Sequence, residues 1–308
     1  MRPINLIVPT LTFSSFAYVA RIVKILLENF NTNTIDPPAN ITISTNYKHG
    51  FLNIRIDDMV LTLREARFCD IAWLDSALDM QNVHPNVLRK PARIFVCSEN
   101  DKRKAESKGV KVEGVVPRPF NPLAYAFRRP NITKKYDVCV IGWYEKVDRK
   151  NFDIMNEIVT KLNLKVVSIT NYPFKGERYD FSSVDDFMKF SLIAQSKYLL
   201  HLSGHEGFGM PPLEAMAVGT PVIYLDAPAH NEFAVGESIP ARDKVVLKHP
   251  LGNITVMKPD VKEAIEIVKN AMDTYDSVQY CEMVRDCYQM SDAMFHKVVN
   301  WLREICTR

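Results

Sequence analysis

The sequence predicts an α/β protein made of two doubly wound lobes, each with a parallel sheet covered by helices on both faces. Short β-rich runs alternate with longer helical patterns over most of the 308 residues. A segment rich in proline and basic residues, VPRPFNPLAYAFRRPNITKK at 116–135, interrupts this alternation, which restarts with YDVCVIGW at 136–143. We therefore assign a first lobe to 1–130 and a second to 131–290. Ligands bind at the carboxyl ends of the strands in such sheets, so two facing lobes would form a binding cleft.

Apolar, β-branched runs in the first lobe predict strands, and two longer runs predict helices. The expected strands lie at 4–10, 41–45, 70–75 and 93–98, and the expected helices at 16–30 and 99–109. The helix at 16–30 is apolar on nearly every face, with Arg21 and Lys24 as its only cations. Two interpretations stay open: this helix is packed between the sheet and solvent, or it lies on a membrane surface.

The second lobe repeats the pattern and is followed by helices. Its expected strands lie at 136–143, 165–170, 197–203 and 221–225, and its expected helices at 151–162, 183–195 and 212–218. Three further helical stretches, at about 260–275, 278–289 and 291–305, have no strand between them. We expect them to brace the two lobes, with the last helix, about 291–308, packing back on the first lobe.

The composition is that of an ordinary globular protein of the cytoplasm. Hydrophobic residues make up 47% and charged residues 24%, and no apolar run approaches the roughly 18 residues of a membrane span. The start, MRPINLIVPTLTF, contains Pro9 and lacks a small-residue cleavage site, so a first strand explains it better than a signal peptide. None of the six cysteines forms a CxxC pair, which favours reduced thiols and a cytoplasmic location.

The charge is uneven along the chain. Residues 1–130 carry 18 Lys and Arg against 12 Asp and Glu, or +6, and the remainder carries 21 against 24, or −3, which together give +3. A basic front half indicates an anionic partner or peripheral contact with a membrane surface, although surface charge also drifts without purpose.

One segment of the second lobe joins an expected strand to an expected helix and reads HLSGHEGFGMPPLEAMAVGTPVIYLD at 201–226. Its glycines permit backbone conformations closed to other residues, and its double proline suits the first turn of a helix. The N–H groups of Gly207 to Met210 and the positive helix end form an anion site with Glu206 and Glu214 on its flanks. A nucleotide-sugar, with hydroxyls on both sides of its diphosphate, fits this layout. The simpler reading is that the glycines only turn the chain and that Glu214 only complements the helix dipole.

The string HEGFGMPPLEAMAVGTPVI resembles the E-x7-E signature of the retaining GT-B glycosyltransferases of the large glycosyltransferase family four. The resemblance covers roughly 136–240, including AHNEF after the last strand, and is thin in the first lobe. It implies a GT-B fold, with two Rossmann-like lobes facing across a cleft: an acceptor-side lobe at 1–130 and a nucleotide-sugar-binding lobe at 131–290. It also implies a hexosyltransferase that moves a sugar from a nucleotide-diphosphate sugar to an acceptor hydroxyl with retained anomeric configuration, using no metal or other cofactor.

The resemblance further implies which side chains neutralise the departing diphosphate. Lys150, in VDRKNFDI, matches the family lysine. Trp143 stands where the family has an arginine, so Arg149 or Lys146 would supply the second positive charge. Such fixed cations stabilise the charge that develops when the sugar–phosphate bond breaks. The aspartate pairs at 57–58 and 185–186 lack the spacing of a metal-binding DxD motif, and we interpret them as helix or turn surface.

Other residues would hold the rest of the donor. By the same resemblance, Glu206 would contact hydroxyls of the donor sugar, and Glu214 would bind the ribose. The remaining expected donor-binding residues are Gly207, Phe208, Gly209 and Met210, whose backbone would cradle sugar and phosphates, His205 beside Glu206, and Thr170 and Val184 near the base.

The first lobe offers fewer candidates. The family's glycine-rich loop is here TLTFSSFA, whose Ser14 and Ser15 either offer hydroxyls to a ligand or cap the next helix. Asp75 stands at a strand end where many relatives have a histidine; it either receives the acceptor proton or caps a helix. An anionic or lipid-linked acceptor would suit the basic lobe.

Two other functions stay open on the same fold. One is a nucleotide-sugar epimerase, against which the E-x7-E string argues. The other is a nucleotide-sugar-binding protein whose transfer activity has lapsed, suggested by Trp143 and by the missing glycines of the first lobe. The sequence contains no HExxH, P-loop or G-x-S-x-G pattern, so it gives no support to the enzymes that use them.

Overall fold

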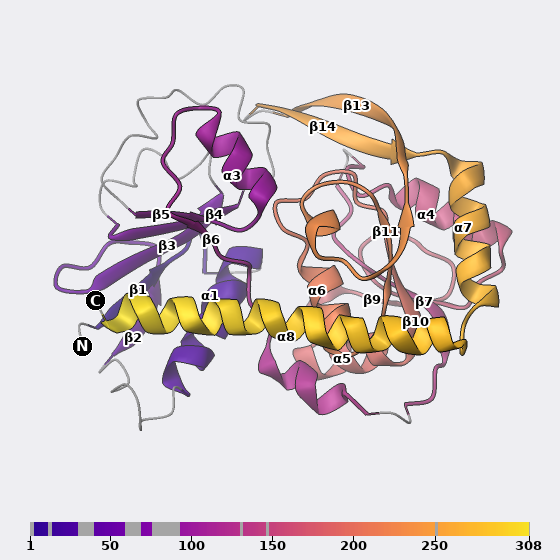
Figure 1. The fold of residues 1–308 in the computed structure, drawn as a ribbon, viewed down its shortest axis with the longest axis horizontal. Coiled ribbons are helices and arrows are strands. Elements are labelled where there is room, and N and C mark those ends of the chain that lie inside the picture. Colours follow the sequence, from indigo (N-terminus) through magenta and orange to yellow (C-terminus); the bar gives the residue numbers. More distant parts are fainter. Residues whose placement is uncertain are drawn as a thin grey trace. The chain divides into compact units, whose positions relative to one another are not determined.

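The computed structural model describes residues 3–11, 14–29, 40–58, 69–75, 93–129, 132–145, 148–249 and 252–307. The chain divides into two compact units (Figure 1). Unit 1 comprises Met1–Pro119, His249–Asn253 and Met294–Arg308, and unit 2 comprises Phe120–Lys248 and Ile254–Ala293. Each unit contains a six-stranded sheet with helices, which confirms the α/β class expected from the sequence.

Unit 1 is built on a parallel sheet with the strand order β2-β1-β3-β4-β5-β6. Its strands are β1 (Ile4–Ile7), β2 (Ile41–Ser44), β3 (Leu52–Asp58), β4 (Ile71–Asp75), β5 (Arg93–Val96) and β6 (Gly114–Val115), and its described helices are α1 (Ser15–Glu28) and α3 (Glu99–Glu106). Ile4 of β1 pairs with Ile41 on one side and with Leu52 on the other. All three side chains are buried, so the centre of this sheet is an apolar core.

Helix α1 packs one face into that core. Ser14 caps it, because the Ser14 Oγ accepts a hydrogen bond from Ala17 N at 3.1 Å. The buried residues of the helix are Ala17, Val19, Ala20, Ile22, Val23, Leu26 and Leu27. Arg21 and Ile25 lie on the exposed face. The packed interpretation of this helix and the capping role of Ser14 are therefore confirmed.

The sequence predicts helix or turn surface for the aspartate pair at 57–58, but both residues belong to strand β3. Asp57 lies at the end of β3 and is fully buried. Arg55 Nη2 lies 2.7 Å from Asp57 Oδ2. Alternate residues of a strand share a face, so Arg55 and Asp57 compensate each other inside the sheet. The charged residues in NIRIDD are unusual for a buried strand, so no strand was predicted there from the sequence.

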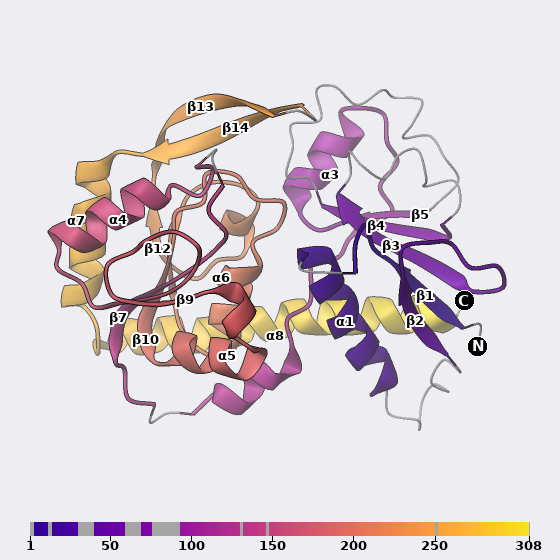
Figure 2. The ribbon, with the colours of Figure 1, turned by 180° about the vertical axis from the view of Figure 1, so that it is seen from behind.

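Unit 2 has a second parallel sheet, with the order β12-β11-β10-β7-β8-β9. Its strands are β7 (Tyr136–Ile141), β8 (Val166–Ile169), β9 (Glu177–Tyr179), β10 (Ser196–His201), β11 (Val222–Leu225) and β12 (Gly236–Ile239). Its α-helices are α4 (Phe152–Lys161), α5 (Asp186–Ala194), α6 (Met210–Ala217) and α7 (Val261–Asp273), and its 3-10 helices are η4 (Pro122–Phe127), η5 (Phe181–Ser183) and η6 (His230–Glu232). β13 (Ala241–His249) and β14 (Gly252–Pro259) form a separate two-stranded ribbon (Figure 2).

The last helix differs from the expectation. The sequence predicts separate helices at about 278–289 and 291–305, but α8 (Val278–Thr307) is one helix, as Figure 1 shows. No glycine or proline stands between its ends, so nothing in the chain interrupts it. In unit 1, the ring of Trp301 lies 4.7 Å from that of Trp73. No helix among the described residues is long and apolar enough to cross a membrane.

Candidate active site

Two of the three predicted basic residues, Arg149 and Lys150, meet Glu206 at the carboxyl edge of the unit 2 sheet. Arg149 and Lys150 lie in the loop between β7 and α4, and Glu206 lies in the loop between β10 and α6. Lys150 Nζ forms an ion pair with Glu206 Oε1, and Arg149 Nη1 lies 3.5 Å from Glu206 Oε2. β7 and β10 are paired strands, so both loops leave the sheet at the same place. We call these three residues the rim cluster.

Backbone and amide hydrogen bonds fasten the two loops together. Gly204 N donates to Arg149 O at 2.9 Å, and Met257 N in β14 donates to Gly204 O at 3.0 Å. The buried Asn151 side chain donates to Leu202 O at 2.7 Å and to Met257 O at 3.0 Å. A Cβ at Gly204 would lie 2.0 Å from Met257 O, so only glycine fits there. The rim cluster is thus positioned by main-chain contacts.

Burial and mutual charge set the ionisation of the cluster. The side chains of Lys150 and Glu206 are 12% and 11% exposed. Burial alone would raise the pKa of Glu206, but Lys150 and Arg149 outweigh it and hold that pKa well below its ordinary value. Burial lowers the pKa of Lys150, although Glu206 opposes the shift. Glu206 is therefore a carboxylate at neutral pH, and Lys150 loses its proton at a lower pH than an exposed lysine does.

Two buried histidines that the sequence analysis missed adjoin the cluster. His201 ends β10, and its Nε2 lies 3.7 Å from Glu206 Oε1. Its ring packs edge-on against that of His230, with a centroid distance of 4.8 Å and an interplanar angle of 89°. His230 Nε2 donates to Leu225 O at 3.0 Å. Burial lowers the pKa of both imidazoles, to about 4 for His230, so both rings are neutral at neutral pH.

The turn before α6 has the conformation that its glycines permit. Gly209 caps the helix with a φ of 101°, and the helix begins at Met210 rather than at 212, with the two prolines inside its first turn. A Cβ at Gly209 would lie 2.7 Å from His230 Cβ, so the turn packs closely on that histidine. The Phe208 ring is buried and stacks on Phe233 at 4.9 Å, so this side chain belongs to the core. Only the backbone of Phe208 is then left for a ligand.

The second glutamate of the signature is buried in an ion pair. Glu214 Oε1 lies 2.7 Å from Lys189 Nζ in α5, and Lys189 Nζ also lies 3.0 Å from Asp186 Oδ1. Burial alone would lower the pKa of Lys189, but Glu214 and Asp186 outweigh it and raise that pKa. This ion pair was not predicted from the sequence. The role of Glu214 toward a ribose stays a prediction.

Both the side chain and the backbone carbonyl of His205 are hydrogen-bonded to other residues. Its Nδ1 donates to Thr255 O at 2.9 Å, and its carbonyl oxygen accepts from Arg149 Nη1 at 3.0 Å. His205 therefore fixes the guanidinium of Arg149 through its backbone.

Two residues, Thr170 and Val184, are expected near the base. Thr170 follows β8 and is fully buried, and its Oγ1 accepts from Tyr172 N at 3.0 Å. Val184 follows η5 and is half-buried. Lys146 lies outside the described residues, so of the two candidates for the second cation the structure places only Arg149.

Asp75 belongs to unit 1, whereas the other predicted site residues belong to unit 2. Its Oδ2 lies 3.3 Å from Nη2 of Arg118, which is almost fully buried. The Arg118 guanidinium lies 4.9 Å from the centre of the Trp73 ring. Asp75 thus balances a buried cation. Its alternative role as a helix cap falls on 76–92, outside the described residues.

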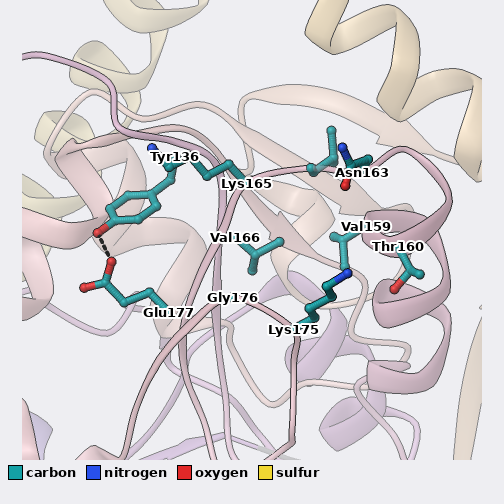
Figure 3. Close-up of a pocket in the computed structure, with 10 residues that line it drawn as sticks. Tyr136, Val159, Thr160, Asn163, Lys165, Val166, Lys175, Gly176 and Glu177 are labelled. Atoms are coloured by element: carbon teal, nitrogen blue, oxygen red, sulfur yellow. Dashed lines mark hydrogen bonds between the residues drawn. The ribbon is translucent and has the colours of Figure 1, made fainter.

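A cavity of about 350 Å³ lies at the opposite, amino edge of the unit 2 sheet (Figure 3). At its wall, Tyr136 Oη donates to Glu177 Oε2 at 2.5 Å. Burial and this bond raise the pKa of Tyr136. The cavity is lined by the starts of β7, β8 and β9, so it is separate from the rim cluster. Among the described residues, no three His, Cys, Asp or Glu side chains gather to hold a metal ion.

Solved structures share this architecture. Anabaena HepE in complex with UDP and glucose aligns with a TM-score of 0.67 over 100% of both chains, at 11% identity. WaaG, a glycosyltransferase involved in lipopolysaccharide biosynthesis, aligns with a TM-score of 0.63 over 99% of both chains, at 14% identity. The fold is therefore GT-B, with two Rossmann-like lobes.

Sequence comparisons define the family. Residues 179–246 match the family described as glycosyl transferases group 1. A protein of Sulfolobus islandicus filamentous virus named as glycosyltransferase 48 is 31% identical over 220 residues, which are 68% of this chain and 69% of that protein. A protein of Acidianus filamentous virus 2 named as glycosyltransferase ORF330 is 31% identical over 200 residues, 59% of this chain and 58% of the relative. The chain belongs to the group 1 glycosyltransferase family.

Proposed function

We propose that this protein transfers a hexose from a nucleotide-diphosphate sugar to an acceptor hydroxyl, with retained anomeric configuration and without a metal. The observation that carries the proposal is the rim cluster, in which two cations and one carboxylate, all mostly but not fully buried, meet at the sheet edge where such folds bind ligands. Family membership supports transfer chemistry. The HepE structures with UDP and glucose and with UDP-glucose support a nucleotide-sugar donor.

Lys150 and Arg149 would stabilise the leaving diphosphate. Breaking the sugar–phosphate bond gives the sugar oxocarbenium character and leaves negative charge on the phosphate oxygens. Once the donor is bound, the two cations and the N–H groups at the start of α6 would already face that charge before the bond breaks, and one such contact contributes roughly 3 kcal/mol. This much positive charge serves the purpose for which other enzymes bind a metal.

Glu206 would orient the donor sugar. Donor binding redirects Lys150 from Glu206 toward the diphosphate, and the carboxylate then accepts hydrogen bonds from sugar hydroxyls. The neutral rings of His201 and His230 border this carboxylate without adding a competing charge. Glu214 would bind the ribose from α6.

The acceptor would meet Asp75 in unit 1. Arg118 lies 3.3 Å from the Asp75 carboxylate and would hold it in place, and that carboxylate would take the proton of an acceptor hydroxyl. The excess of positive charge in residues 1–130, 18 cations against 12 anions, favours an anionic or lipid-linked acceptor and peripheral contact with a membrane surface.

Thermal-shift titration with UDP, GDP and ADP, each with and without an attached sugar, tests donor binding, because a bound ligand raises the Tm by mass action. Hydrolysis of the bound donor in the absence of an acceptor should be slow but measurable, and the released sugar should keep its anomeric configuration by NMR. EDTA should leave the rate unchanged. Binding without hydrolysis would identify a lapsed enzyme, an epimerised sugar would identify an epimerase, and inhibition by EDTA would require a metal.

A further inference from the structure

Trp143 presents a large apolar ring to solvent at the edge that carries the rim cluster. The ring is 56% exposed, whereas the other two tryptophans of the chain, Trp73 and Trp301, are buried in unit 1. Trp143 stands two residues after the end of β7. Burying an indole is among the most favourable contributions that an aromatic side chain makes, so an exposed one at a ligand edge indicates a binding surface.

The backbone on both sides of Trp143 is fixed. Gly142 N donates to Ile169 O at 3.1 Å. Tyr144 N donates to Asn171 Oδ1 at 2.6 Å, and Asn171 Nδ2 donates back to Tyr144 O at 2.9 Å. The exposed indole is therefore held on a firm support, and its exposure is not the result of a loose loop.

A second aromatic ring stands beside Trp143. Phe181 of η5 is 38% exposed, and the two ring centres are 6.1 Å apart with an interplanar angle of 52°. Lys150 of the rim cluster lies close to the residue that precedes Trp143, since a Cβ on Gly142 would lie 3.0 Å from Lys150 Cδ. An apolar aromatic corner and a pair of cations thus occupy one edge of the sheet.

We propose that Trp143, together with Phe181, is the stacking surface for the nucleobase of the donor. This inference rests on the proposed function, because it assumes that the ligand is a nucleoside diphosphate. Such a ligand joins a flat aromatic ring to an anion, which matches an exposed indole on the same sheet edge as Lys150. The side chain of Asn171, which follows β8 nearby, already hydrogen-bonds to the backbone of Tyr144. Stacking, which every base can supply through its π-face, is therefore the main contact with the base.

Tryptophan fluorescence reads this contact directly, because Trp143 is the only tryptophan of unit 2. UDP, GDP or ADP should quench the emission of the wild-type protein and should leave that of Trp143→Phe unchanged. Pyrophosphate and glucose 1-phosphate, which lack a base, should quench neither. Quenching by glucose 1-phosphate would place the sugar on the indole and overturn the proposal.

Affinities give the second readout. Base–aromatic stacking of this kind predicts that Trp143→Ala weakens nucleoside diphosphate binding about tenfold, that Trp143→Phe keeps most of the affinity, and that pyrophosphate binds all three proteins equally. Phe181→Ala should show a smaller loss. Phe187→Ala, which removes a 59% exposed ring that contacts Phe127, is the matched control and should change nothing.

The outcomes separate the two proposals. If the wild-type protein binds nucleoside diphosphates and Trp143→Ala binds them as tightly, the stacking surface is wrong and the proposed function stands. If the wild-type protein binds no nucleoside diphosphate, both are wrong. Circular dichroism of each variant confirms that the fold is retained.

Discussion

Replacement of Glu206 by glutamine should tighten the binding of a free nucleoside diphosphate and slow the transfer of its sugar. In the structure, Lys150 and Arg149 both form ion pairs with the Glu206 carboxylate. A diphosphate must compete with that carboxylate for the same two cations. Glutamine keeps the shape of the side chain and removes its charge, so the cations become available while the sugar hydroxyls lose an ionised acceptor.

The size of the effect follows from the separation of the charges. Arg149 Nη1 and Glu206 Oε2 are 3.5 Å apart. At that distance a pair of unit charges is worth about 1.2 kcal/mol at the dielectric constant of water and about 5 kcal/mol at an effective constant of about 20. The lower figure alone corresponds to roughly eightfold in affinity, and Lys150 lies closer, so the Kd should fall at least about tenfold.

Isothermal titration of UDP, GDP and ADP into the wild-type protein and Glu206→Gln measures this change. Glu263→Gln is the matched control, because Glu263 forms an exposed ion pair with Arg242 at 2.6 Å in the same unit. That variant should bind as the wild type does. A folded Glu206→Gln protein whose Kd is equal to or higher than that of the wild type would show that the carboxylate does not compete with the diphosphate.

Three further predictions follow from the same geometry. Burial lowers the pKa of Lys150 from 10.5, and the charged form exists below its pKa, so kcat/KM should fall as the pH rises, and at a lower pH than an exposed lysine would cause. Lys150→Arg should move that fall to higher pH, and an unchanged profile would remove Lys150 from the mechanism. Gly204→Ala should lower the Tm strongly, because its Cβ would lie 2.0 Å from the carbonyl oxygen of Met257. Gly114→Ala is the control and should lower the Tm little, because its Cβ would have no contact under 3.4 Å. Equal losses of Tm in the two variants would contradict the clash. Lys189→Met should lower the free energy of unfolding by about 3 kcal/mol, because it leaves the buried Glu214 without this partner. Adding Glu214→Gln to that variant should recover part of the lost Tm. No recovery would argue against the pair.

The part of the site that depends on strand ends was predictable from the sequence. Lys150 and Glu206 follow strands whose apolar runs are easy to recognise, and parallel strands carry their carboxyl ends to one edge. The choice of Arg149 as a partner of Glu206 was not predictable. It depends on hydrogen bonds between Arg149, Gly204 and His205, which join segments far apart in the chain.

The histidines were missed for a different reason. A lone histidine in an apolar strand usually belongs to the core, and both His201 and His230 are indeed buried. The available signals were the position of His201 at the last residue of a strand and that of His230 within AHNEF. Neither signal reveals that the two rings meet, because that contact joins β10 to η6.

Charged residues hid two features of the fold, strand β3 and the ion pair of Glu214. Asp57 in β3 and Glu214 in α6 both have an acidic side chain that is usually exposed, yet Arg55 and Lys189 neutralise them inside the fold. The Arg55 pairing was visible as an i, i+2 pattern once a strand is assumed. The Lys189 pairing crosses from α5 to α6 and needs the structure.

Release of nucleoside diphosphate from sugar donors tests the role of the rim cluster most directly. A panel of UDP-, GDP- and ADP-sugars is incubated with the wild-type protein, with Lys150→Met and with Lys262→Met, which removes an exposed lysine of α7. Lys150→Met leaves Arg149 3.5 Å from Glu206, so the carboxylate stays compensated and the fold should survive. We expect the wild type and Lys262→Met to release the diphosphate from at least one donor, and Lys150→Met to be about 100-fold slower or more. Equal rates for Lys150→Met and the wild type, or no release from any donor, would contradict the account.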